Sequence, residues 1–245
     1  MEILVCMSVV PDTTTKITFS DNNKTFNKTG VQYIINPYCE LALSKAIELS
    51  EKHNANVTVI HVGGNQNDPI IRKALAMGAH QAIRVDAEPK DGQFVAREIA
   101  EYAKTKSFDL ILSGRESIDF NSGMVGNLVA AYLDLEHANV VTELDVDDNN
   151  LICIRDIDGG REKLAIKMPA SASAQKDLIE PKIPNMRGIM QARTKPLHVI
   201  APSVAENVGN IQNYELPKGK QEVKLFDTDE VANLIDVLKN DKKLF

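Results

Sequence analysis

The segment between residues 114 and 126 gathers residue types that bind anions. It follows an apolar run at 110–112, precedes an apolar helical pattern, and contains three glycines together with Arg115, Glu116, Ser117, Asp119, Asn121 and Ser122. A strand, a polar turn and a helix start in this order bring backbone N–H groups and the positive end of a helix to one point, where phosphates bind. Because neither G-x-G-x-x-G nor G-x-x-x-x-G-K-[ST] occurs here, a capped loop without a ligand is the alternative interpretation.

The stretch INPYCE, residues 35–40, has the composition of a helix start. Asn36 is a good N-cap, Pro37 suits the first helical position, and Glu40 in the first turn is favoured by the helix dipole. This helix should begin at the same sheet edge as the segment after residue 112. A ligand contact is one interpretation of this stretch, and capping alone is the simpler one.

A third stretch, EPKIPNMRGIMQAR at 180–193, has the composition of a contact surface. Two prolines precede apolar and basic side chains, namely Met186, Arg187, Ile189, Met190 and Arg193. Methionine adapts to varied surfaces, and exposed apolar groups usually mark interfaces. The composition equally allows a surface loop that folds onto its own sheet.

The composition excludes several functional classes. A net charge of -6 disfavours nucleic acid as a partner, and the absence of Trp with 5% aromatic residues disfavours a base-stacking surface. Cys6, Cys39 and Cys153 lie far apart and the histidines are scattered singly, so we expect neither a disulfide framework nor a metal site. No histidine accompanies a nucleophile in a loop, so we expect no catalytic residue.

Membrane insertion and export are also not expected. No run of 18 apolar residues occurs, and the first residues, MEILVCMSVV, lack a basic leader and continue directly into an expected strand. We therefore expect a protein of a reducing, bacterial cytoplasm.

Strands and helices alternate four times along the first part of the chain. Apolar runs predict strands at 3–10, 57–62, 82–85 and 110–112, and helical spacing predicts helices capped by Asn36 and by Asp68 and further helices at 91–104 and 125–133. A polar excursion at 12–30 has room for a hairpin. The alternation predicts an α/β fold, a mostly parallel sheet with helices on both faces, in which ligands bind beyond the carboxyl ends of the strands.

The pattern changes after residue 138. Alternating runs at 140–146, 151–157 and 164–168 are separated by Asp/Asn and Asp-Gly turns, which predicts an antiparallel meander added to the sheet. The last forty residues are polar, with one amphipathic helix near 228–238. We expect a domain at 1–200 and, at 201–245, a C-terminal arm that packs on a partner.

Five stretches together resemble the beta subunit of electron transfer flavoprotein. In chain order they are VQYIINPYCELALSKAIEL, IIRKALAMGAHQAIRV, DLILSGRESIDF, RDIDGGREKLAIKMP and EPKIPNMRGIMQARTKPL. The resemblance covers about residues 1–200 and implies an adenine-nucleotide alpha-hydrolase-like fold and an electron-carrier subunit rather than an enzyme. In this family the alpha subunit holds most of the FAD, and the beta subunit encloses the FAD from one side and buries a structural AMP.

The resemblance also implies positions for the binding residues. The AMP pocket would comprise Cys6, Asn36, Pro37, Tyr38, Cys39, Val62, Gly114, Arg115, Glu116, Ser117, Ile118, Asp119, Phe120, Asn121, Ser122, Gly123, Met124 and Val125. A recognition loop at 176–193 would dock acyl-CoA dehydrogenase-type flavoenzymes of fatty acid beta-oxidation through Met186, Arg187 and Ile189. A quinone oxidoreductase would accept the electrons, and the C-terminal arm would pack on the alpha subunit.

Two departures from the family pattern open alternatives. AMP-binding members carry Asn-Gln-Thr where this chain has Gly123-Met124-Val125, which keeps backbone N–H groups but removes polar side chains. Electron-bifurcating relatives, which use NADH, hold a second FAD in the same pocket. The stretch MPASASAQKD, 168–177, is more polar than the family's approach to the recognition loop. Further alternatives are an ATP-binding, stress-protein-like α/β protein, weakly suggested by the run SGRES at 113–117, and a binding module that has lost its nucleotide.

Overall fold

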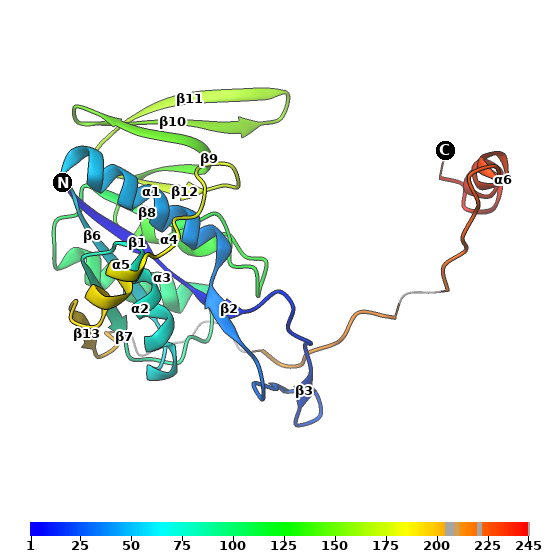
Figure 1. Cartoon of the computed structure of the whole chain (residues 1–245), viewed down its shortest axis with the longest axis horizontal. Helices are drawn as coiled ribbons and strands as arrows, with labels where there is room; N and C mark the ends of the chain where they lie inside the picture. The colour runs from blue at the N-terminus through cyan, green and yellow to red at the C-terminus, as the bar shows by residue number, and fades with distance from the viewer. Residues whose placement is uncertain (204–208, 210, 220–221, 245) are drawn as a thin grey trace. The chain divides into compact units, whose positions relative to one another are not determined.

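A nine-stranded sheet forms the centre of the molecule's larger unit (Figure 1). The computed structural model describes residues 1–203, 209, 211–219 and 222–244, and the chain divides into a unit of Met1–Thr18 with Asn27–Gln212 and a unit of Phe19–Phe26 with Asn213–Phe245. The strand order is β11-β10-β9-β12-β8-β1-β6-β7-β13. The strands are β1 (Glu2–Cys6), β6 (Asn56–Val62), β7 (Gln81–Val85), β8 (Leu110–Gly114), β9 (Glu136–Asp147), β10 (Asn150–Ile157), β11 (Gly160–Lys167), β12 (Ala170–Ala174) and β13 (Leu197–Ile200).

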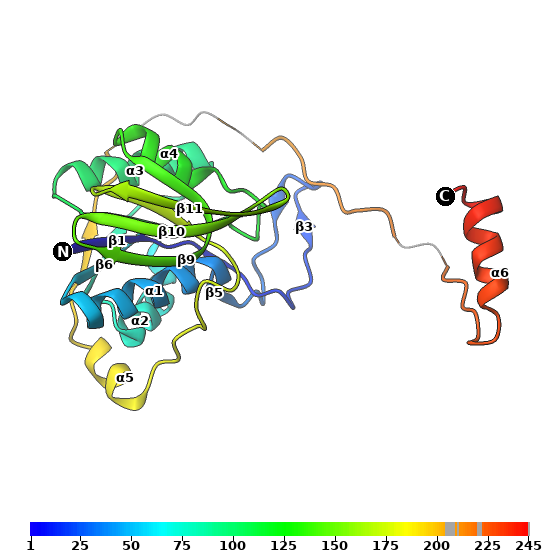
Figure 2. The ribbon, with the colours of Figure 1, turned by 90° about the horizontal axis from the view of Figure 1, so that it is seen from above.

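Helices cover both faces of this sheet, which confirms the predicted fold class (Figure 2). Helices α1 (Pro37–His53) and α2 (Asp68–Met77) lie on one face, and α3 (Gly92–Lys104) and α4 (Met124–Tyr132) on the other. Alternate residues of a strand point to opposite faces. Accordingly Ile3 and Val5 of β1 join the core under α1 and α2, whereas Leu4 joins the core under α3 and α4.

The strand order reverses beside β1. From β1 the chain proceeds through β6 to β7 on one side, then returns to β8 on the other side of β1. All of these pairs are parallel, so their carboxyl ends share one edge of the sheet. Such a reversal leaves a crevice between the diverging loops, which is where α/β sheets bind ligands.

The predicted strand at 3–10 is wrong in its second half. β1 ends at Cys6, and β2 (Val9–Pro11) pairs antiparallel with β5 (Tyr33–Ile35) in a separate two-stranded sheet. Val10 of β2 and Ile35 of β5 are also buried. The apolar run of the sequence therefore continues from β1 into β2. Composition alone does not reveal where the chain leaves one sheet for another.

Two strands of the parallel sheet were not predicted. β12, with the sequence ASASA, lies between β8 and β9, and β13 pairs with β7 at the far edge. Every residue of β12 is buried. β12 lies within the stretch MPASASAQKD, 168–177, and is a central strand built from small side chains.

The predicted antiparallel meander is confirmed. β10 pairs antiparallel with both β9 and β11, and β9 also pairs parallel with β12, which joins the meander to the main sheet. The turn at Asp148 has a φ of 49° and the turn at Gly159 a φ of 85°. Both turns stand where Asp/Asn and Asp-Gly runs predicted them.

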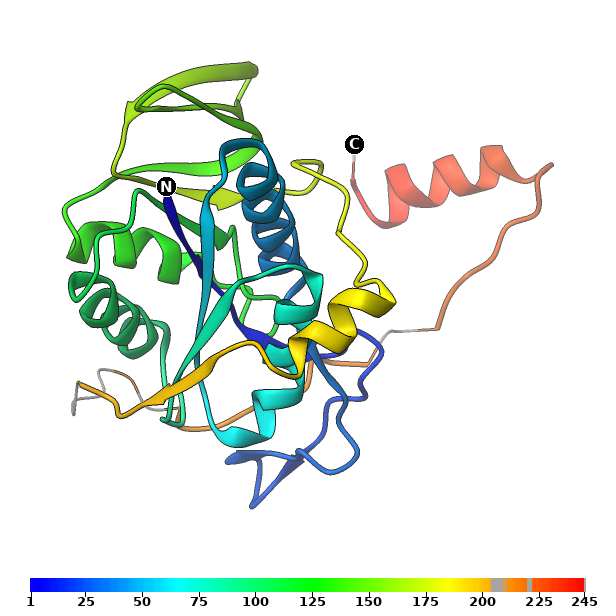
Figure 3. The ribbon, with the colours of Figure 1, turned by 60° about the vertical axis from the view of Figure 1, so that its left-hand side comes forward.

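A short helix, α5 (Met186–Ala192), lies beside α2 (yellow and cyan in Figure 3). Arg72 of α2 fixes the end of α5, because its Nη1 donates to the carbonyl oxygens of Ala192 at 2.8 Å and Lys195 at 2.6 Å. Asn185 caps the start of α5 by accepting a hydrogen bond from Gly188 N at 2.8 Å. The segment at 180–193 is thus anchored on the domain and keeps an exposed apolar side.

The second unit combines a hairpin with the C-terminal segment. The hairpin is formed by β3 (Phe19–Ser20) and β4 (Thr25–Phe26), which lie within the polar segment at 12–30 where the sequence left room for a hairpin. Tyr214 stacks on Phe19 with ring centroids 4.7 Å apart, and its backbone N donates to the Asn23 carbonyl oxygen at 2.7 Å. Helix α6 (Val231–Asp236) runs into a π-helical turn (Val237–Asp241), close to the predicted helix at 228–238.

Candidate functional site

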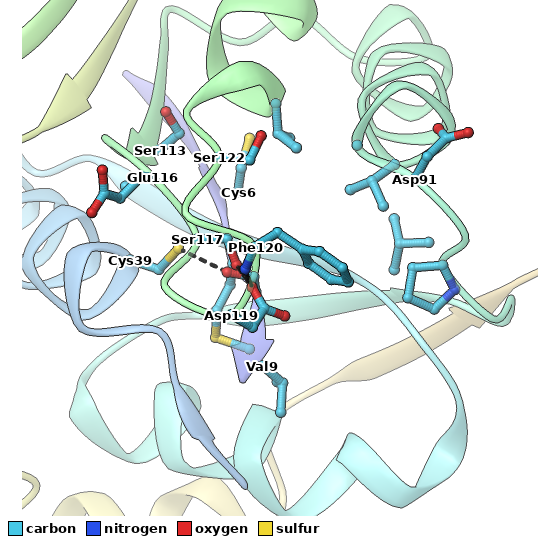
Figure 4. A pocket seen from close by; sticks show the side chains of 18 of the residues that line it. Cys6, Val9, Cys39, Asp91, Ser113, Glu116, Ser117, Asp119, Phe120 and Ser122 are labelled. Atoms are coloured by element: carbon cyan, nitrogen blue, oxygen red, sulfur yellow. Dashed lines mark hydrogen bonds between the residues drawn. The ribbon is translucent and has the colours of Figure 1, made fainter. Parts of the chain in front are cut away.

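A cavity of about 450 Å³ opens at the carboxyl ends of β1, β6 and β8 (Figure 4). Its floor includes the strand ends at Cys6, Val62 and Ser113. The volume lies within the range of roughly 300–1,000 Å³ that is usual for small-molecule sites. The cavity lies where the strand order reverses, as the sheet topology requires.

The loop after β8 folds over one side of this cavity. Ser117 and Ser122 exchange backbone hydrogen bonds of 2.9 and 3.3 Å, so that residues 118–121 form its tip. Several of the loop's backbone N–H groups donate within the protein, at Arg115, Ser117, Ile118, Phe120 and Ser122. The amides at those five positions are therefore already paired and are not the groups that would bind an anion.

Asn36 holds the loop against the start of α1. It occupies the N-cap position before Pro37, as predicted, but its side chain forms no capping hydrogen bond. Its Nδ2 donates to the Glu116 carbonyl oxygen at 2.7 Å and to Cys39 Sγ at 3.2 Å, and its Oδ1 accepts from Ile118 N at 3.3 Å. Since Asn36 is fully buried, it stabilises the cavity wall from behind.

The start of α4 faces the cavity without a side-chain cap. Gly123 occupies the N-cap position and has no side chain that could cap the first-turn amides. Beneath that turn, Ser113 Oγ is buried and has no hydrogen-bond partner among the described residues. A Cβ on Gly126 would lie 2.2 Å from this oxygen, so any larger residue there would force Ser113 to move. The uncapped turn is the part of the loop that keeps anion-binding character.

The start of α3 forms the opposite wall, which sequence reasoning did not assign to the site. Pro89, Lys90, Asp91 and Gly92 line the cavity, followed by Val95 and Ile99 of the helix. Asp91 caps α3 by accepting from Phe94 N at 2.6 Å, and its other oxygen accepts from Gly209 N at 2.7 Å. The sequence holds a signal that could have found this wall, because helix 91–104 follows the expected strand at 82–85 and so begins at the carboxyl edge of a parallel sheet.

His61 and Asn67 close the cavity beside β6. His61 Nδ1 donates to the Met7 carbonyl oxygen at 3.0 Å, so in its neutral form Nε2 accepts from Asn67 Nδ2 at 2.8 Å. Burial lowers the pKa of His61, which keeps it neutral. The predicted N-cap of α2, Asp68, is wrong, because Asn67 occupies that position. The side chain of Asn67 bonds to His61 and does not cap the helix.

The charged groups of the loop are largely paired within the loop. Arg115 Nη2 lies 2.7 Å from Glu116 Oε2, and the Arg115 guanidinium lies 5.3 Å from the centre of the Tyr38 ring. The Glu116 contact raises the pKa of Arg115, so it stays charged. Asp119 accepts from Ser117 Oγ and from Phe120 N. Burial raises the pKa of the Cys6 thiol, and the nearby Cys39 adds a smaller effect in the same direction. The thiol of Cys6 therefore stays protonated.

The structure brings most of the predicted pocket residues to this cavity. The predicted residues that line it are Cys6, Cys39, Val62, Gly114, Glu116, Ser117, Asp119, Phe120, Ser122, Gly123 and Val125. The predicted residues that do not line it are Asn36, Pro37, Tyr38, Arg115, Ile118, Asn121 and Met124. Lining residues that were not predicted include Met7, Ser8, Val9, His61, Asn67, Ser113 and the α3 start.

The described part of the chain contains neither a candidate metal site nor a candidate membrane-spanning helix. No group of three His, Cys, Asp or Glu residues there is placed to hold a metal ion, and no helix there is long and apolar enough to cross a membrane. The cysteines at 6, 39 and 153 are free and buried.

Fold and cavity together define an α/β protein with a ligand-sized cavity at the reversal of its parallel sheet. The model of the electron transfer flavoprotein domain matches residues 24–205. The electron transfer flavoprotein subunit beta of Syntrophomonas wolfei subsp. wolfei is 35% identical across 100% of this chain and 98% of its own. The subunits of the same name from Bacillus subtilis (36% identical, 80% of this chain and 77% of its own) and Homo sapiens (33%, 82% of each) are similar.

The chain belongs to the electron transfer flavoprotein family, and its relatives there are beta subunits. The matched region contains the cavity loop, the starts of α1, α3 and α4, and the α5 segment.

Proposed function

We propose that this chain is the beta subunit of a heterodimeric electron transfer flavoprotein, whose cavity holds an adenine nucleotide, AMP in the first instance. The observation that carries the nucleotide assignment is the cavity itself, with its uncapped helix start at Gly123 and an apolar remainder. Family membership favours an electron carrier over the stand-alone ATP-binding alternative.

The residues of the cavity fit a nucleotide phosphate at one end. The first turn of α4 directs its amides outward from Gly123, and the positive helix end favours an anion. Close to that turn, the buried hydroxyl of Ser113 has no hydrogen-bond partner among the residues that the structure describes. Backbone N–H groups would then bind the phosphate, because Gly123, Met124 and Val125 have no polar side chain to do so. The carboxylate of Glu116, which would repel a phosphate, is paired with Arg115.

In this function the FAD, held mainly by the alpha subunit, supplies the redox chemistry when bound. The contribution of this chain is positional, with no catalytic residue. Asn36 and the Ser117–Ser122 bridge fix the wall of the nucleotide cavity, and His61 is held neutral beside it. The three free cysteines support a reducing, cytoplasmic location.

The α5 segment is the proposed docking site for flavin dehydrogenases. Met186 is 74% exposed and Ile189 44% exposed, with Arg187 exposed between them. Asn185 and Arg72 fix the two ends of this short helix, so the apolar side chains are displayed on an ordered support. Apolar anchors beside an arginine are typical of protein contact sites. We propose acyl-CoA dehydrogenase-type enzymes as donors and a quinone oxidoreductase as acceptor.

The C-terminal segment is the proposed contact with the alpha subunit. Apolar side chains along it are exposed, at Leu216, Val223, Leu225, Val231 and Ile235. An amphipathic helix whose apolar face stays exposed among the described residues indicates a missing partner.

A second FAD in the cavity is the alternative occupant. The exposed aromatic ring of Phe120 at the cavity wall favours a planar ligand and is compatible with a flavin as well as with adenine. In that case the protein is a bifurcating flavoprotein subunit and the cavity loop surrounds a redox centre.

The test is co-expression with the matching alpha subunit. We expect a stable heterodimer that carries flavin absorbance and accepts electrons from a flavin dehydrogenase. A complex without flavin, or ATP hydrolysis by the chain alone, would overturn the proposal.

A further inference from the structure

The tip of the loop after β8 displays an aromatic ring that the domain itself does not cover. Phe120 lies between Asp119 and Asn121 in the turn closed by the Ser117–Ser122 bridge. Its side chain is 66% exposed although it is a large apolar ring. Single exposed apolar residues are common on proteins, so exposure alone assigns no role.

The backbone of the tip holds this ring in place. Asp119 Oδ1 accepts from Phe120 N at 3.0 Å and also from the Ser117 hydroxyl. Asn121 adopts a φ of 48°, which turns the chain back toward Ser122. These contacts fix the backbone on both sides of Phe120, so the loop sets the point from which its side chain extends.

The ring extends into the cavity. Figure 4 shows Phe120 extending from the loop across the cavity in the direction of the α3 start, which carries Asp91. Pro89, Val95 and Ile99 line the cavity from the α3 side and present apolar surface. The ring and this wall both line the cavity, whereas the uncapped α4 start provides the anion-binding end.

We propose that Phe120 stacks on the planar nitrogen heterocycle of the nucleotide in this cavity, an inference that rests on the proposed function. A ligand with a phosphate at one end and a flat ring at the other matches both ends of the cavity. An aromatic face adds stacking with such a ring beyond what an aliphatic side chain supplies by burial. Adenine and the flavin ring share this chemistry.

Three substitutions in the purified heterodimer separate stacking from burial. Phe120→Leu keeps an apolar side chain without a flat ring, Phe120→Ala removes both, and Phe120→Trp enlarges the ring. The chain contains no Trp, so Phe120→Trp also introduces a single fluorescent reporter into this subunit. Val199→Ala, an exposed apolar position outside the cavity lining, is the matched control.

The readout is the dissociation constant for added AMP, and separately for added FAD, together with the nucleotide retained on dialysis. We expect Phe120→Leu and Phe120→Ala to weaken binding about five-fold or more, from the worth of a stacked base. Phe120→Trp should keep wild-type affinity and lose fluorescence when the nucleotide binds. If the flavin is the stacked ring, its visible absorbance bands shift in Phe120→Leu; if adenine is, they do not.

Equal affinity of Phe120→Leu and wild type, in a complex that does hold the nucleotide, overturns the inference and leaves the proposed function intact. Loss of subunit assembly in Phe120→Ala with undiminished nucleotide occupancy also overturns it, since Phe120 would then be a subunit contact. A wild-type complex that holds flavin but no nucleotide in this cavity contradicts the proposed nucleotide assignment itself.

Discussion

Asn36 joins helix α1 to the loop after β8, because its Nδ2 donates to the Glu116 carbonyl oxygen at 2.7 Å and its Oδ1 accepts from Ile118 N at 3.3 Å. One buried amide thus satisfies two backbone groups that lie 80 or more residues away in the sequence. The cavity wall depends on this link, since the rest of the loop tip is exposed.

Replacing Asn36 by Ala should destabilise the protein by about 2 kcal/mol or more. Two backbone groups lose their partner, and each buried unpaired group costs about 1–3 kcal/mol. The measurement is the free energy of unfolding in denaturant, together with nucleotide retention. Asn127→Ala is the control, because Asn127 is exposed and its Nδ2 donates to one carbonyl oxygen, that of Gly123, at 2.8 Å. Equal effects of the two substitutions would contradict the account.

Gly126→Ala should destabilise the protein by about 1–3 kcal/mol, although Gly→Ala within a helix ordinarily stabilises by about 0.5–1 kcal/mol. The new methyl group would lie 2.2 Å from Ser113 Oγ. Combining it with Ser113→Ala should restore part of the loss, because the oxygen in conflict is gone. Gly160→Ala, which has nothing within 4 Å, should be close to neutral. Independent, additive effects at 113 and 126 would refute the contact.

The sequence predicted the parts of the fold that rest on local patterns. Helix α2 ends at Gly78, whose φ of 143° only glycine adopts easily, and the meander turns follow Asp/Asn and Asp-Gly runs. β12 could not be predicted in the same way. Its ASASA sequence lacks β-branched residues and becomes a strand only because it is buried between β8 and β9.

The candidate site could likewise be predicted where it follows from local patterns and not where it depends on distant contacts. The sheet-edge rule placed the loops after β1, β6 and β8 at one point, and the cavity lies there. The partners of Asn36 and Asn67 were not foreseeable, because both side chains fit the pattern of a helix cap yet bond across space instead. A distant partner that competes with a local cap leaves no trace in the local sequence.

His137 should make stability fall in acid. Burial lowers its pKa from 6.5 to about 4, so the unfolded chain binds a proton before the folded one does. Stability is therefore fully present above pH 6.5 and is lost as the pH falls toward about 4, by at most about 3 kcal/mol from this group. His137→Gln should flatten this part of the profile of unfolding free energy against pH. Identical profiles of His137→Gln and wild type would contradict the assignment.

Met186→Ala should slow the reduction of the complex by its donor dehydrogenase without changing its flavin content. Loss of a central apolar anchor costs about 1–2 kcal/mol of docking, or roughly five- to thirty-fold in rate at low donor concentration. Stopped-flow absorbance of the flavin measures this rate. The control is Ile157→Ala, which removes an exposed apolar side chain of β10 outside the α5 segment. A rate unchanged in Met186→Ala would exclude this residue from docking.

The most direct test of the central claim is to release the small molecules from the natively purified heterodimer and count them by mass spectrometry. We predict one FAD and one AMP per heterodimer, with the AMP lost from the Asn36→Ala complex before the FAD. Two FAD and no AMP would assign the cavity to a second flavin and the protein to the bifurcating class. FAD alone, with no second nucleotide, would contradict the claim that this cavity is a nucleotide site.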